Sequence, residues 1–308
     1  MKIARFGGGR LSRRSERAGL LLGALLWSAA PLGLAATAGE ALVKRGEYIY
    51  RAGGCANCHT TRNGGAENAG GVAVESPFGV FYGPNITPDR EHGIGAWSEA
   101  DFVRALRAGV SPAGEHYYPA FPYTSYTRLH DDDLRALWAY LNSRPAVARP
   151  NKPHELVWYA RFRPALGLWK MRYFMPGPFT PDSARPAQVN RGAYLAAAVH
   201  CVECHTPRDL LGGLKPDLYY AGTRDGPDGA AIPNITPDKK TGIGEWSRSD
   251  LAYYLEMGLA PDGDSAGDLM ADVIDNSTGH LTREDLDAIA AYVFSLPPIE
   301  HDVSDSQK

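Results

Sequence analysis

The stretch GGCANCHTTR, residues 53–62, places two cysteines and a histidine within five positions. The stretch VHCVECHTPR, residues 199–208, repeats this C-x-x-C-H arrangement and contains the only other two cysteines of the chain. A disulfide inside such a pair would close a very short loop and add little stability. The two motifs therefore indicate that the cysteines have a use other than a disulfide, and that a histidine takes part in it.

The chain repeats itself around these motifs. RGEYIYRAGGCANCHTTR matches RGAYLAAAVHCVECHTPR at an offset of 146 residues, the two segments that begin NITPD match at 149, and LHDDDLRALWAYLNSRP matches LTREDLDAIAAYVFSLP at 152. The offset grows by three twice, as expected of two copies that keep their helices and vary their loops. Repetition over most of the chain indicates a duplicated domain.

Each copy reads as three helices joined by loops. In the first copy we expect helices at 45–53, from Ser98 onward, and at 131–142. Ser98 and Asp101 have the spacing of a capped helix start, which Ser247 and Asp250 imitate in the second copy. No run shows sustained strand alternation, so the predicted fold class is all-α.

The first 38 residues have the order of a secretory signal: a basic start, an apolar run, and the small residues ATA at 36–38. An uncleaved anchor is the alternative, since the apolar run is close to the length that spans a bilayer. Removal of 1–38 leaves 26 basic and 34 acidic side chains, a formal net charge near −8. Such an acidic chain is not expected to bind nucleic acid.

The C-x-x-C-H motif has the groups that a haem c requires, two thiols for thioether bonds and an imidazole to ligate the iron. Zinc is the alternative, because thiolates and histidines also bind it. An export signal and a domain-sized repeat favour haem. The predicted attachment and ligand residues are Cys55, Cys58, His59, Cys201, Cys204 and His205.

Other repeated residues suit the rest of such a site. The haem propionates are anionic and require donors, and the repeated candidates are Trp97, Trp246, Arg62 and Arg208. The N–H of each ligating imidazole requires an acceptor, which we expect from the backbone near Pro84 and Pro233.

With these residues in view, the chain resembles exported di- and tri-haem c-type cytochromes, the electron-transfer subunits of periplasmic or membrane-associated dehydrogenases. The resemblance rests on C-x-x-C-H-T-x-R, NITPD, GIG-x-WS and YPAFPYTSY, and spans both repeats. It implies two tandem class I cytochrome c domains and two covalently bound haem c groups. The domains are expected at 39–145 and 187–298, with a linker rich in proline and aromatic residues at 146–186 and a tail at 299–308.

The resemblance also implies a function. The chain is expected to be a periplasmic dihaem cytochrome c that takes electrons from a dehydrogenase and passes them to another cytochrome, a quinone or an oxidase. The resemblance leaves open whether the chain associates with the membrane. It also does not identify the dehydrogenase.

The ligand opposite each histidine differs between the copies. Many relatives have methionine at the fourth position of a Y-P-A-M-P-Y segment, where this chain has Phe121. Met270 lies 24 residues after Trp246, as Phe121 does after Trp97, and is the predicted ligand of the second haem. For the first haem the candidates are His116, the linker methionines Met171 and Met175, or no ligand.

The missing methionine keeps a second function class open. A haem enzyme, such as a dihaem peroxidase or a thiosulfate-oxidising cytochrome, has one iron with an open or weakly held position. A cysteine-ligated haem of the second type is not expected here, because four thioether bonds use all four cysteines.

The linker carries aromatic and basic side chains side by side. Its aromatic residues are expected to fill the seam between the domains; they include Trp158, Phe162, Trp169 and Phe174. The sharper hypothesis adds the basic residues, as a docking strip for a partner; these are Arg161, Arg163, Lys170 and Arg172.

Overall fold

The computed structural model of the chain describes residues 31–62 and 64–304 and is mostly helical. The first half contains α1 (Pro31–Ala52), α2 (Cys55–His59), β1 (Ala73–Ser76), β2 (Gly79–Tyr82), α3 (Glu99–Ala108), α4 (Tyr123–Tyr126) and α5 (Asp131–Asn142). The linker contains β3 (Glu155–Leu156), the 3₁₀ helix η1 (Trp158–Arg161) and α6 (Ala165–Tyr173). The second half contains α7 (Ala187–Ala198), α8 (Cys201–His205), η2 (Pro216–Leu218), η3 (Pro227–Gly229), α9 (Arg248–Met257), α10 (Asp268–Asn276), η4 (Thr278–His280) and α11 (Arg283–Val293).

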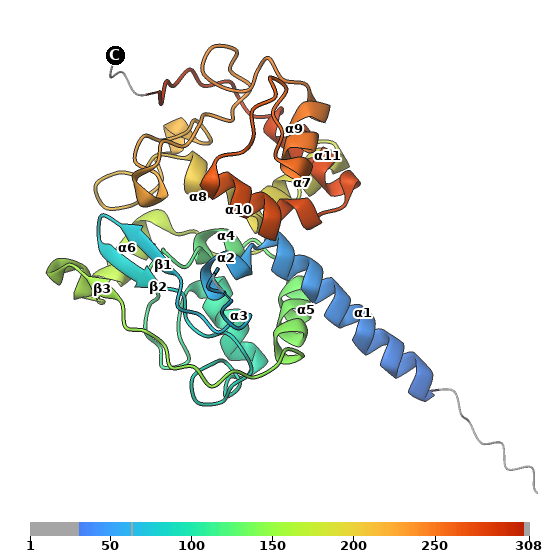
Figure 1. Cartoon of the computed structure of the whole chain (residues 1–308), viewed down its shortest axis with the longest axis vertical. Helices are drawn as coiled ribbons and strands as arrows, with labels where there is room; N and C mark the ends of the chain where they lie inside the picture. The colour runs from blue at the N-terminus through green and yellow to red at the C-terminus, as the bar shows by residue number, and fades with distance from the viewer. Residues whose placement is uncertain (1–30, 63, 305–308) are drawn as a thin grey trace, which may run out of the picture.

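In each half the first long helix packs against the last one, α1 on α5 and α7 on α11 (Figure 1). The crossing is close enough to require glycine. A Cβ on Gly46 would overlap the carbonyl of Ala136, and a Cβ on Gly192 would overlap that of Ala288. These pairs occupy the same positions in the two repeats, so the duplication predicted from sequence is also a duplication of packing.

The sequence signals for the helices are confirmed. Helix α5 has the predicted bounds, and α3 and α9 begin after Ser98 and Ser247. Each serine side chain accepts from the backbone of the aspartate three residues on, and that aspartate accepts from the serine backbone. Two donors that the first turn leaves unpaired are thereby satisfied in each copy.

Buried apolar side chains of both halves form one continuous cluster. Fully buried members of the first half are Tyr50, Leu134 and Tyr140, and of the second half Leu195, Leu286 and Ile289. The halves therefore share a core across their contact.

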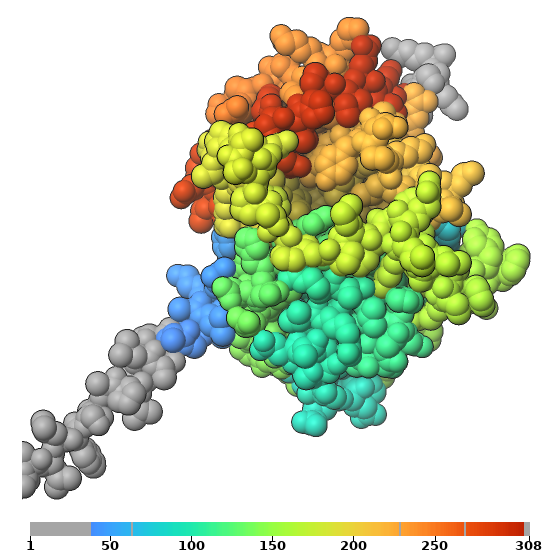
Figure 2. All heavy atoms as spheres, turned by 180° about the vertical axis from the view of Figure 1, so that it is seen from behind, coloured from blue at the N-terminus to red at the C-terminus, as the bar shows by residue number. Residues whose placement is uncertain are grey.

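A three-stranded antiparallel sheet, in the order β1-β2-β3, was not predicted. Its third strand belongs to the linker, and Gly79 of β2, with a φ of 110°, lies where a Cβ would overlap the backbone of Glu155. The linker then runs over the seam between the halves (Figure 2). Lys170 of α6 is buried and donates to the carbonyls of Ala108 and Gly109 at the end of α3, at 2.8 and 2.6 Å. The linker is thus fastened to the first half.

The asparagine of each NITPD segment holds the chain that follows the last helix. Asn85 donates to the carbonyl of Val147 at 2.8 Å, and Asn234 donates to that of Ile299 at 2.7 Å. The first residues of the predicted linker and of the predicted tail therefore occupy equivalent places.

Each half also donates one tyrosine hydrogen bond to the other half, and the two bonds are equivalent in the repeat. Asp133 accepts from Arg45 of its own half and from Tyr194 of the other. Asp285 accepts from Arg191 of its own half and from Tyr48 of the other. The contact therefore has a two-fold relation that follows the repeat.

Most of the expected signal, residues 1–30, lies outside the described residues. Within the described part of the chain, α1 and the other helices are too short or too polar to cross a membrane.

Candidate functional site

Both C-x-x-C-H motifs form five-residue helices, α2 and α8. Each is preceded by a residue in the left-handed region, Gly54 with a φ of 57° and His200 with a φ of 53°. This turn reverses the chain after the long helix, so that the two cysteines and the histidine lie on one short helix. The repeat keeps the turn even where the second copy has no glycine.

The two imidazoles are held in the same way, as predicted. His59 Nδ1 lies 2.7 Å from the carbonyl of Pro84, and His205 Nδ1 lies 2.9 Å from that of Pro233. Since Nδ1 donates to this carbonyl, Nε2 is left as the nitrogen with a free lone pair. Desolvation lowers the pKa of both histidines below 6.5, although the proline carbonyls work against it. Neutral imidazoles are the form that binds a metal.

The four cysteines are free thiols, and each is partly buried. Burial raises the pKa of Cys55 and Cys201 to about 12 and that of Cys204 to about 11. Two protonated thiols beside an oriented neutral imidazole fit a covalently attached haem, in both copies.

The expected distal residues lie in equivalent segments. Met270 is in α10, partly buried against the shared core. Phe121 precedes α4 and packs between the rings of Tyr117, Tyr123 and Tyr126, with centroids 5.6 to 6.2 Å away. An aromatic cluster thus occupies the place of the methionine in the first half.

The other candidate ligands of the first haem lie in or beside the linker. His116 lies against α6, where its Nδ1 is 3.0 Å from Lys170 Nζ and its Nε2 faces Gly167. Met171 and Met175 are 85% and 75% exposed. The assignment of each of the three as ligand of the first haem stays a prediction.

The four predicted propionate partners fall into two groups. Trp97 and Trp246 are partly buried against the core. Both arginines have carboxylate partners: Arg62 pairs with Asp272 of the other half, and Arg208 pairs with Glu203 at 2.5 Å. A role toward propionates would have to be shared with these ion pairs.

The distal segment of each half contacts the motif of the other half. Helix α10 packs on α2, and Ser277, next to α10, donates to the carbonyl of Ala52 at 2.9 Å. Thr124 and Ser125 of α4 donate to Glu203 of α8 at 2.5 and 2.8 Å. The two motifs therefore lie near each other across the seam. Sequence reasoning missed Glu203, although its place between two cysteines made it visible.

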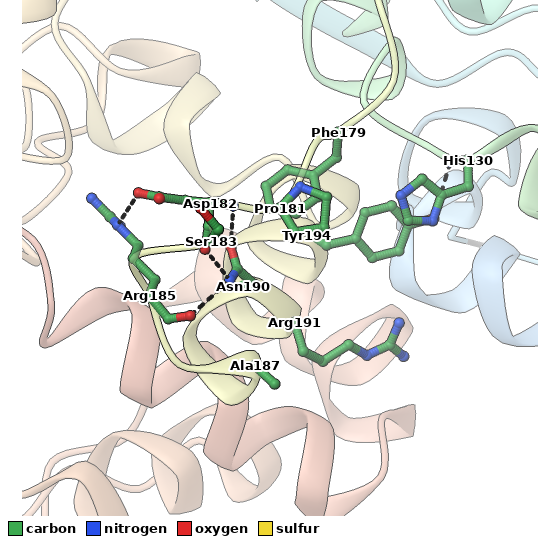
Figure 3. A pocket seen from close by; sticks show the side chains of 10 residues that line it. All are labelled: His130, Phe179, Pro181, Asp182, Ser183, Arg185, Ala187, Asn190, Arg191 and Tyr194. Atoms are coloured by element: carbon green, nitrogen blue, oxygen red, sulfur yellow. Dashed lines mark hydrogen bonds and ion pairs between the residues drawn. The ribbon is translucent and has the colours of Figure 1, made fainter.

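A hollow of about 390 Å³ lies elsewhere, where the end of the linker meets α7 (Figure 3). The ring of His130 stacks on Tyr194 at 4.4 Å on one side of it, and Asp182 and Arg185 lie on the other. It contains no residue of either C-x-x-C-H motif, so it is separate from the haem sites.

Comparison with known proteins agrees with this geometry. The cytochrome c family model matches residues 43–145 and again 189–297. A "Diheme cytochrome c-type" protein of Cereibacter sphaeroides is 43% identical over 303 residues, which cover 94% of this chain and all of that protein.

Two further relatives are named as subunits of dehydrogenases. The cytochrome c subunit of alcohol dehydrogenase (quinone) from Gluconobacter oxydans is 40% identical over 85% of this chain and 56% of its own length. The cytochrome c subunit of gluconate 2-dehydrogenase from Pantoea cypripedii is 39% identical over 84% of this chain and 60% of its own length. The chain thus spans only part of these two relatives. Two oriented C-x-x-C-H helices, two family matches and a dihaem relative lead to one conclusion: the chain belongs to the cytochrome c family and carries two covalently bound haem c groups.

Proposed function

We propose that the chain is an exported electron-transfer protein of the periplasm that accepts electrons from a dehydrogenase and passes them to a cytochrome, quinone or oxidase. The dehydrogenase partner is supported by relatives that are named as cytochrome subunits of such enzymes. The acceptor and the location are inferred from the chemistry and from the signal-like start of the chain.

The observation that carries the proposal is the arrangement of the two motifs. Each distal segment contacts the motif of the opposite half, through α10 on α2 and through α4 on Glu203 of α8. Two redox groups held on either side of one seam suit transfer between them, whereas a single substrate site would require only one. The shared core keeps the halves from separating.

The residues of the chain would divide the work as follows. Cys55 and Cys58 would hold the first haem, and Cys201 and Cys204 the second. His59 and His205 would bind iron through Nε2, with their orientation fixed by the proline carbonyls. Met270 would complete the second site. For the first site the candidates stay His116, Met171, Met175 or no ligand. The haem supplies one-electron exchange, and the chain sets its potential by ligand, burial and charge.

The test uses the full holo-chain made in cells that attach haem c. It is mixed with the purified dehydrogenase encoded beside its own gene, and reduction is followed at the haem α-band. Both haems should be reduced once the dehydrogenase substrate is added. If dithionite reduces both haems but the dehydrogenase with substrate reduces neither, the proposal is wrong.

A haem enzyme is the second candidate, and Phe121 is the observation that favours it. Phenylalanine cannot ligate iron, so the first haem could keep an open position. An open iron would bind carbon monoxide, and the chain alone would turn over peroxide or thiosulfate. Turnover of that kind would favour this candidate over electron transfer.

A further inference from the structure

We propose that the linker forms the docking surface for the electron-donating dehydrogenase. The inference rests on the proposed function and adds the place and the chemistry of the contact. Its core is a group of exposed apolar side chains, named here the linker strip. The strip consists of Trp158, Phe162, Leu168, Met171, Met175 and Leu210.

The side chains of the strip are among the most exposed large apolar side chains of the described residues. Trp158 is 82% exposed, Met171 85% and Leu210 99%. All but Leu210 come from 18 consecutive linker residues, and Leu210 comes from the loop after α8 that the linker touches. Large apolar side chains that stay exposed together along one segment are typical of an interaction site in soluble proteins. The prediction that the linker aromatics only fill the seam is therefore wrong for Trp158 and Phe162.

The composition of the strip is that of a protein interface. Tryptophan, phenylalanine, methionine and arginine are enriched at such interfaces, whereas lysine and the acidic residues are depleted. Residues 156–181 contain three arginines, one lysine and no acidic residue. The lysine, Lys170, is buried and holds α6 in place. Arg163 pairs with Glu115. Arg161 and Arg172 are exposed. Arg161 Nε donates to the carbonyl of Leu156 at 2.9 Å, which holds this side chain at the surface beside the strip.

The charge of the strip selects the partner. The mature chain is expected to have a net charge near −8, yet this segment is basic. A partner surface that is apolar at its centre and acidic at its rim would complement the strip. A second copy would bring its own strip, and the same positive charge, to a symmetric contact. A dehydrogenase with an acidic rim is therefore the occupant we infer.

The position of the strip relative to the haem sites supports the same partner. Trp169 donates to the carbonyl of Leu211 at 2.9 Å, and Tyr173 donates to Asp209 at 2.7 Å, in the loop that begins at the end of α8. On the other side, the linker contacts the distal segment of the first half. Tyr118, which lies three residues before Phe121, donates to the carbonyl of Ala160 at 3.0 Å. The strip thus adjoins segments of both haem sites. An electron donor bound there would lie beside the groups that it reduces.

The test compares two double variants of the holo-chain. Trp158→Ser with Phe162→Ser removes two large side chains of the strip. Tyr253→Ser with Met257→Ser removes two exposed apolar side chains of α9, outside the strip, as the matched control. Haem content, α-band spectrum and unfolding midpoint should match those of the parent in both variants. The rate constant for reduction by the dehydrogenase at limiting concentration should fall about tenfold or more for the strip variant only.

A charge variant tests the partner's chemistry. Arg161→Glu with Arg172→Glu should slow reduction further at low ionic strength and reverse its salt dependence, because attraction to an acidic rim becomes repulsion. Reduction by a small uncharged mediator should not change in any variant.

Each other outcome overturns the inference. If the parent is reduced and the strip variants are reduced equally fast, the docking surface is wrong and the proposed function stands. If the parent is not reduced at all, the proposed function fails with it. Binding of the parent, but not the strip variants, to phosphatidylglycerol vesicles with unchanged reduction would assign the strip to the membrane. A strip-dependent dimer with unchanged reduction would assign it to a second copy.

Discussion

Position 57 of the first half and position 203 of the second lie between the two cysteines of equivalent motifs, yet their surroundings differ. Glu203 accepts hydrogen bonds from Thr124, Ser125 and Arg208, so its charge is fully paired at the seam. Asn57 is neutral, and its Oδ1 is buried without a hydrogen-bond partner among the described residues. Both copies orient the histidine through a proline carbonyl. They differ in the residue between the two cysteines, both in its charge and in its hydrogen bonds.

The arginines that follow the motifs show the same divergence. Arg208 pairs with Glu203 in its own motif, whereas Arg62 reaches across the seam to Asp272 of α10. A duplicated backbone thus carries two different electrostatic settings for one cofactor. The difference teaches that the two haems should have different potentials even apart from their distal ligands, since nearby charge is one of the levers on haem potential.

The strongest test removes the attachment groups of one half at a time. Cys55→Ala with Cys58→Ala should leave a chain that is lighter by one haem in denaturing mass spectrometry, and Cys201→Ala with Cys204→Ala should do the same. The parent should carry two. Loss of both haems from either variant, or of neither, would contradict the independence of the two sites.

The next test exchanges the distal residues. Met270→Ala should remove the weak sulfur-to-iron band near the red end of the oxidised spectrum and lower the potential of the second haem, because a thioether ligand raises it. Phe121→Met should add such a band and raise the potential of the first haem. Potentiometric titration of the α-band measures both.

His116→Ala serves as the control for the first site. A high-spin first haem in this variant would assign His116 as its ligand. Two low-spin haems with unchanged potentials would contradict that assignment and make Met171 the next residue to test.

The third test concerns the seam. Glu203→Ala leaves the hydroxyl groups of Thr124 and Ser125 without their shared acceptor and should lower the free energy of unfolding by about 1–3 kcal/mol. Arg208 is exposed and keeps the carbonyl of Gly212 as a partner, so the loss of its ion pair should add little. Asn57→Ala removes an amide whose oxygen is unpaired and should cost less than about 1 kcal/mol. Denaturant unfolding of the two holo-variants measures both losses. Equal losses would contradict the different roles of positions 57 and 203.

The smallest expected effect is in the exchanged tyrosines. Tyr48→Phe and Tyr194→Phe should each cost about 1 kcal/mol, and their effects should be similar because the contacts are equivalent. Unequal losses would show that the two-fold relation is geometric but not energetic.

The hydrogen bond from Tyr48 to Asp285 also gives the stability of the chain a pH dependence. Burial works to raise the pKa of Asp285, but the hydrogen bonds from Arg191 and Tyr48 outweigh it and hold the pKa below 3.8. A depressed pKa contributes stability that is present above 3.8 and is lost as the pH falls through the folded value. Tyr48→Phe should therefore move the acid unfolding midpoint to higher pH. An unchanged acid midpoint would contradict this.

Features that depend on local sequence were predictable. The bounds of α5, the caps at Ser98 and Ser247, and the proline carbonyls behind the histidines follow from residues near each other or from the repeat itself. The repeat offsets place elements in register within each copy, and this was sufficient for the fold class and the motifs.

Features that depend on how the copies face each other were not predictable. The sheet was missed because its strands have only two to four residues and β3 lies some 75 residues after its partner. Arg62 was predicted to serve a propionate, and nothing in the sequence indicated that it also pairs with Asp272 of the other half. The repeat gives no information about the seam, so the pairing of Glu203 with α4 had no signal in either copy alone.

The anchoring of the linker by Lys170 and β3 has a consequence for dissecting the molecule. A gene fragment that stops at residue 145 would omit β3, which completes the sheet. It would also omit Lys170, whose ammonium group donates to the carbonyls at the end of α3. It would also expose the carbonyl groups that these elements cover. A fragment extended through residue 181 would keep them, so the structural unit around the first motif is longer than its repeat. The second half also depends on the linker, because Trp169 and Tyr173 donate to the loop after α8.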